Sequence, residues 1–86
     1  MRTYPIPDSL DAAYKGSGWA VAATLNGVVV GIRYMEDVAP EIDLGDPYSS
    51  IAAWIESSSA TPIVRELQAL GQVSVGMVSN WTFTEL

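Results

Sequence analysis

The chain has 86 residues, 49% of them apolar, a length that suits one domain over residues 1–86 with a modest core. It contains neither cysteine nor histidine, which removes disulfides, thiolate zinc sites and the usual general base and nucleophile pairs. Ten acidic residues against four basic ones give a formal charge of −6. Direct binding to nucleic acid or to an anionic membrane is therefore disfavoured.

The N-terminal region is predicted to be extended and then briefly helical. Prolines restrict residues 4–7 to extended conformations, so this stretch is expected along a sheet edge. Asp8 or Ser9 can cap a short helix over about residues 9–15, which Gly16 would end.

Residues 19–35 predict a β-hairpin. Asn26-Gly27 stands between two apolar runs and is typical of a two-residue type I′ turn. Counting outward from this turn pairs Leu25 with Val28 and places four large residues on one face, to be buried. These residues are Trp19, Val21, Ile32 and Tyr34. The other face carries small residues and is expected either to be thinly covered or to serve for self-association. Its members are Ala20, Ala22, Val29, Gly31 and Val78.

Two helices are predicted after the hairpin, over about residues 47–57 and 62–70. Asp46-Pro47 and Thr61-Pro62 each combine a capping residue with a proline suited to the first turn. Both helices are expected to cover the large-residue face of the hairpin, with Tyr48 among the inward residues of the first.

The C-terminal residues 72–84 have apolar residues at most odd positions, which predicts one long strand with a bend. A hairpin turning at Ser79-Asn80 is the alternative. The strand is expected to pair antiparallel with the hairpin's second strand, or else parallel with its first. The predicted fold class is therefore α+β: a three-stranded, mainly antiparallel sheet with two helices on one face and a short N-terminal helix.

The stretch between the hairpin and the first helix holds half of the acidic residues and is predicted to be an exposed loop. The acidic residues of this stretch are Glu36, Asp37, Glu41, Asp43 and Asp46. Clustered carboxylates either dock on a basic partner surface or only keep the loop solvated.

A calcium site is the second interpretation of this stretch, but the spacing fits poorly. An EF-hand pattern started at Glu41 places Gly45 one position early and Ala52 where the bidentate glutamate belongs. No pair of carboxylates stands out for acid-base catalysis. No metal, cofactor or enzymatic activity is therefore predicted.

Trp81 is a further candidate, because it falls late on a strand that is long enough to outrun the sheet. Aromatic residues dominate binding hot spots as well as cores. We expect Trp81 to contribute to a partner interface.

These observations predict a non-enzymatic module that binds and occludes a basic, nucleic-acid-binding type of surface on a larger protein. Small acidic inhibitors, such as phage anti-CRISPR-type proteins and bacterial immunity proteins, act in this way; the comparison rests on size, charge and missing catalytic residues alone. The alternative is an assembly subunit, as in a virion, that oligomerises through sheet edges. Arg2 is followed by Thr3-Tyr4-Pro5 instead of an apolar run, so a cytoplasmic location is expected.

Overall fold

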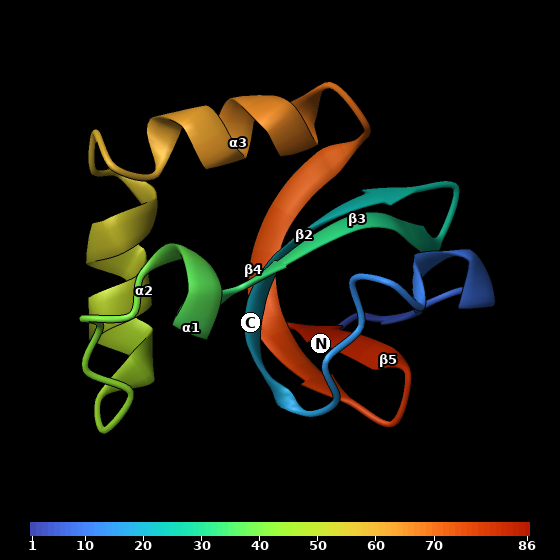
Figure 1. Cartoon of the computed structure of the whole chain (residues 1–86), viewed down its shortest axis with the longest axis horizontal. Coiled ribbons are helices and arrows are strands. Elements are labelled where there is room, and N and C mark those ends of the chain that lie inside the picture. Colours follow the sequence, from blue (N-terminus) through green and yellow to red (C-terminus); the bar gives the residue numbers. More distant parts are fainter.

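A computed structural model describes all 86 residues as an α+β arrangement. Its strands are β1 (Thr3–Pro5), β2 (Gly18–Leu25), β3 (Val28–Tyr34), β4 (Gln72–Ser79) and β5 (Thr82–Glu85). Its helices are α1 (Met35–Val38), α2 (Pro47–Ile55) and α3 (Thr61–Gln68), with one 3₁₀ turn, η1, at Asp8–Leu10. The strands form one antiparallel sheet in the order β1-β5-β4-β2-β3, curved into a half-barrel (Figure 1).

The sheet has five strands, so the three-stranded prediction is wrong, and the C-terminus is the first reason. Residues 72–85 fold back as a hairpin whose turn residues, Asn80 and Trp81, have φ of 50° and 57°. Val78 pairs with Phe83 inside the half-barrel, while Val75 faces the helices. Both faces of the sheet are buried, so the apolar residues of this hairpin do not need to share one face.

The N-terminus supplies the fifth strand. The extended stretch lies at a sheet edge as predicted, because β1 pairs with β5 and the Ile6 amide donates to the Trp81 carbonyl at 2.9 Å. β5 is thereby enclosed between β4 and β1. The predicted helix over 9–15 is wrong in extent: only η1 forms, followed by a turn in which the Ala13 amide donates to the Leu10 carbonyl.

β4 pairs antiparallel with β2, the first strand of the hairpin, so both predicted pairings of the last strand are wrong. In Figure 1, α2 lies beside α1 and α3 leads away from it at a steep angle, over the end of the sheet where β4 begins, so the chain enters β4 beside β2 instead of returning to β3.

The turn of the first hairpin is confirmed, and its register holds for two pairs only. Asn26 and Gly27 have φ of 54° and 81°, Leu25 pairs with Val28, and Thr24 pairs with Val29. The next pair is Ala23 with Gly31, so Val30 is the extra residue of a β-bulge. Beyond the bulge every side chain of β3 lies on the opposite face from the one predicted, and Ile32 and Tyr34 point into the half-barrel.

Two cores therefore fill the two faces of the sheet. The inner core holds Ile6, Ala20, Ala22, Val29, Ile32, Tyr34, Val78 and Phe83, covered by the N-terminal segment through Leu10, Ala13 and Tyr14. The outer core holds Val21, Ala23, Met35, Ala39, Ile51, Trp54, Ala60 and Leu67, covered by the helices. The predicted small-residue surface does not exist, because Ala20, Ala22, Val29 and Val78 are fully buried.

The helix α2 starts at Pro47 as predicted, and α3 starts at Thr61, one residue earlier than predicted, so Thr61 lies in the helix instead of capping it. Their ends, Ile55 and Gln68, come two residues earlier than predicted. A third helix, α1, forms where the sequence predicted only a loop. The longest of the three, α2, has nine residues, and no helix has the length and apolar character needed to cross a bilayer.

Candidate functional site

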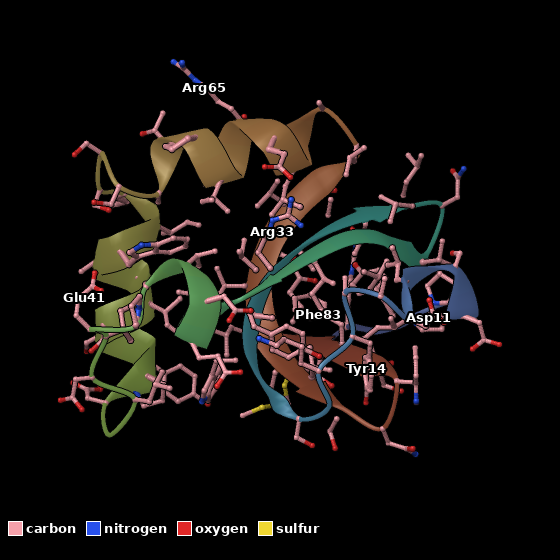
Figure 2. All side chains as sticks on the ribbon, viewed as in Figure 1. Asp11, Tyr14, Arg33, Glu41, Arg65 and Phe83 are labelled. Carbon is pink, nitrogen blue, oxygen red and sulfur yellow. The ribbon has the colours of Figure 1, made fainter.

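The acidic segment, residues 36–46, follows β3 directly and is tied to the outer core. Met35 and Ala39 are buried beneath it, and the Ala39 amide donates to the Met35 carbonyl at 2.8 Å to close α1. All five of its carboxylate residues are exposed. Figure 2 shows Glu41 at the edge of the molecule beside α2. The segment thus begins as a short helix over the outer core and continues as mostly exposed turns.

Lys15 neutralises one end of this segment. Its Nζ lies 2.8 and 2.9 Å from the Asp37 carboxylate oxygens and 3.8 Å from Glu36 Oε1. The hydrogen bond to Asp37 raises the pKa of Lys15, although desolvation works against it. These side chains remain about half exposed, so the ion pair orients Asp37 more than it stabilises the fold.

The other three carboxylates, those of Glu41, Asp43 and Asp46, form no ion pair. Asp43 Oδ1 accepts a hydrogen bond from the Gly45 amide at 2.9 Å, which fixes the turn before α2. Asp46 precedes Pro47, but its side chain makes no capping hydrogen bond, contrary to the sequence prediction. No three carboxylates converge in a way that could hold a metal ion. The segment carries free negative charge.

An apolar cluster that the sequence did not reveal lies inside this acidic surface. Leu44 and Tyr48 are 45% and 66% exposed, and the Tyr48 ring meets the edge of Trp19 with centroids 5.9 Å apart. Tyr48 was predicted to face inward, but it is the second residue of α2 and remains largely exposed. A leucine within the acidic run and a tyrosine just after Asp46-Pro47 were the available signals.

A small cleft of about 90 Å³ opens beside Leu44 and Trp19. Its other lining residues are Ser17, Gly18, Tyr34 and Glu36. It is the one cleft that adjoins both the apolar cluster and a carboxylate of the acidic segment.

Trp81, the sixth predicted site residue, lies apart from the acidic segment. It stands at the β4–β5 turn, where its ring stacks on Tyr14 with centroids 3.8 Å apart. In Figure 2, Tyr14 and Glu41 are on opposite sides of the central strands. The structure therefore divides the predicted site into two surfaces.

The largest cavity, about 480 Å³, lies elsewhere, between β1 and the Asn26-Gly27 turn. Its lining is mainly hydroxyl and amide groups with Arg2 and Tyr4, and it includes no carboxylate. It brings no acid-base pair or nucleophile together.

Comparison with known proteins identifies no relative: no protein-family model matches the chain, and no curated protein matches it in sequence.

Proposed function

We propose that this chain is a non-enzymatic protein-binding module whose acidic segment covers a basic surface, of the nucleic-acid-binding type, on a larger partner. The observation that carries the proposal is the set of unpaired, exposed carboxylates of Glu41, Asp43 and Asp46 on a segment anchored by buried Met35 and Ala39. A pre-ordered charged surface loses little conformational entropy on binding.

The positions of three of the four basic residues support the proposal. Lys15 is engaged by Asp37, and Arg33 forms an ion pair with Glu66 on α3. Arg65 points outward from α3, away from the acidic segment (Figure 2). The negative field of residues 41–46 is therefore not cancelled locally, and such a field accelerates encounter with a basic partner. Inhibition by occlusion, in the cytoplasm of a bacterium or a phage-infected cell, is the setting that we propose.

Reversal of two charges tests the proposal. Glu41→Lys with Asp46→Lys leaves the Lys15 ion pair and the Asp43 turn intact and changes the formal charge from −6 to −2, since each reversal adds two units. Asp8→Lys with Asp11→Lys makes the same change at the two ends of η1, and Figure 2 shows Asp11 on the opposite side of the molecule from Glu41. Affinity capture from the native host should lose its basic protein partner with the first variant and keep it with the second. Equal capture by both variants would refute the proposed surface.

Assembly through sheet edges is the second candidate function, favoured by one observation. β3 is an outer strand of the sheet with strand partners on one side only, and an unpaired edge is a template for a neighbouring strand. Light scattering across a concentration series separates the two functions. A mass above 9.2 kDa that rises with concentration favours assembly.

A further inference from the structure

The apolar cluster of Trp19, Leu44 and Tyr48 and the cleft beside it form a shaped feature within an otherwise charged surface. We infer that this cleft receives one lysine or arginine side chain of the basic partner, with its aliphatic stem against Trp19 and Leu44 and its charged head at Glu36. The inference rests on the proposed function and specifies how the acidic surface recognises its partner.

The exposure of the cluster is the first argument. Leu44 and Tyr48 leave 45% and 66% of their surface in water although buried positions of the outer core lie close by, Ile51 being one turn further along α2. The ring planes of Tyr48 and Trp19 stand 71° apart, an edge contact that leaves Tyr48 66% exposed. Binding hot spots have this anatomy of an aromatic anchor surrounded by polar groups.

The chemistry of the cleft is the second argument. Its walls are mainly Trp19, Tyr34 and Leu44, with Ser17 and the 67% exposed side chain of Glu36 as polar groups. Lysine and arginine combine an apolar stem with a cationic head, and a cation near an aromatic ring face gains further attraction. An anionic side chain would be repelled by Glu36, and a purely apolar side chain would form no ionic contact with the Glu36 carboxylate.

The position of Lys15 is the third argument. Its Nζ lies 2.8 Å from Asp37 but 3.8 Å from Glu36, so Asp37 is its main partner and Glu36 is paired only at the longer distance. The cleft volume of about 90 Å³ exceeds the roughly 30 Å³ that one water occupies in the liquid and suits the end of a side chain. Charge complementarity thus selects a cationic occupant.

Titration of the isotope-labelled protein with hexalysine and with a hexamer of 2,3-diaminopropionate, followed by NMR, tests the inference. Both peptides present cationic amines, but only lysine has a long aliphatic stem. Hexalysine should shift the Trp19 indole and the Leu44 amide, and it should bind at least about threefold more tightly than the short-stemmed peptide.

Tyr48→Ala should weaken hexalysine binding by about threefold, since an exposed cation–aromatic contact has about that value. Leu25→Ala, which removes a residue of similar exposure at the far hairpin turn, is the matched control and should have no effect. Both side chains are more than half exposed, so neither variant should unfold.

Two results would overturn the inference. NMR shifts confined to residues 41–46, with equal affinity for the two peptides, would show that the peptides bind the acidic segment without placing a side chain in the cleft. Hexalysine could also fail to bind while the Glu41→Lys/Asp46→Lys variant still loses its captured partner. That result would refute the cleft as a site for a cationic side chain, but not the proposed function. The proposed function fails separately, when that variant captures as well as the control.

Discussion

The rings of Trp81 and Tyr14 stack with centroids 3.8 Å apart and planes 10° apart, although Trp81 has a backbone φ of +57°. A bulky residue in this left-handed region costs roughly 1–2 kcal/mol. The strained turn is held on both sides: the Trp81 amide donates to the Tyr14 hydroxyl at 3.1 Å, and the Trp81 carbonyl accepts from Ile6. This contact joins the N-terminal segment to the C-terminal hairpin.

Replacement of Trp81 should separate strain from stacking. Trp81→Ala removes the stacked ring and keeps the strain, so we expect a loss of about 2 kcal/mol in unfolding free energy. Trp81→Gly also loses the ring but relieves the strain by recreating an Asn-Gly turn, and it should be about 1 kcal/mol more stable than Trp81→Ala. Urea denaturation measures both. An alanine variant as stable as the glycine variant would show that the turn is not strained.

Two glycines in the sheet should differ in their tolerance of a methyl group. A Cβ at Gly76 would overlap the backbone carbonyl of Thr84 and lie 3.0 Å from Phe83 Cζ. A Cβ at Gly31 would meet no backbone atom: its nearest neighbours are the side-chain ends of Leu70 and buried Leu67, and Leu70 is 47% exposed. We expect Gly76→Ala to cost about 3 kcal/mol and Gly31→Ala about 1 kcal/mol. Thermal unfolding in the reverse order would contradict this packing.

Local signals predicted the parts of the fold that depend on local chemistry. The Asn26-Gly27 turn, the helix start at Pro47 and the extended N-terminal edge form where the sequence indicated, and α3 starts one residue before Pro62. The bulge at Val30 was not predictable, because nothing in a run of valines marks the extra residue. One unpaired residue moved Ile32 and Tyr34 to the other face, and with them the whole assignment of the two cores.

In the candidate site, too, some features follow from the local sequence and others depend on tertiary contacts. Exposure of the carboxylates could be predicted from composition, and the structure bears it out. The pairing of Lys15 with Asp37 joins residues 22 positions apart and depends on how the N-terminal segment crosses the sheet. Trp81 was expected at a strand end, but its turn conformation is one that sequence rules assign to glycine or asparagine. Tertiary contacts override local preference in each case.

Alkaline pH should destabilise the protein through Tyr34. Burial raises the pKa of Tyr34, whose hydroxyl donates to the Gly16 carbonyl at 2.8 Å and accepts from the Lys15 amide at 3.1 Å. A raised pKa in the folded state gives stability that is complete below the unfolded value, about pH 10, and is lost as pH rises through the folded value. Lys15 also has a raised pKa and loses its contribution in the same direction.

Tyr34→Phe isolates this effect. The variant lacks both hydrogen bonds and should be about 1 kcal/mol less stable at pH 8. Its stability should fall less steeply than that of the wild type as the pH rises above about 10, because the buried phenol no longer ionises. Unfolding free energies measured by urea at several pH values test this. Parallel plots of unfolding free energy against pH for the two proteins would mean that ionisation of Tyr34 does not cause the loss of stability at alkaline pH.

Charge and anchor should affect different rate constants of the complex. Long-range attraction acts before contact, so Glu41→Lys with Asp46→Lys should lower the association rate by about tenfold at low salt. The effect should nearly vanish at high salt, where the Debye length falls from about 10 Å at 0.1 M to about 3 Å at 1 M. Tyr48→Ala removes a short-range contact made only in the complex, so it should raise the dissociation rate and leave the salt dependence unchanged. Surface plasmon resonance against the captured partner measures both constants. A charge effect that persists in 1 M salt would mean that Glu41 and Asp46 do not act by long-range attraction. A Tyr48 effect confined to the association rate would mean that Tyr48 makes no stabilising contact in the complex.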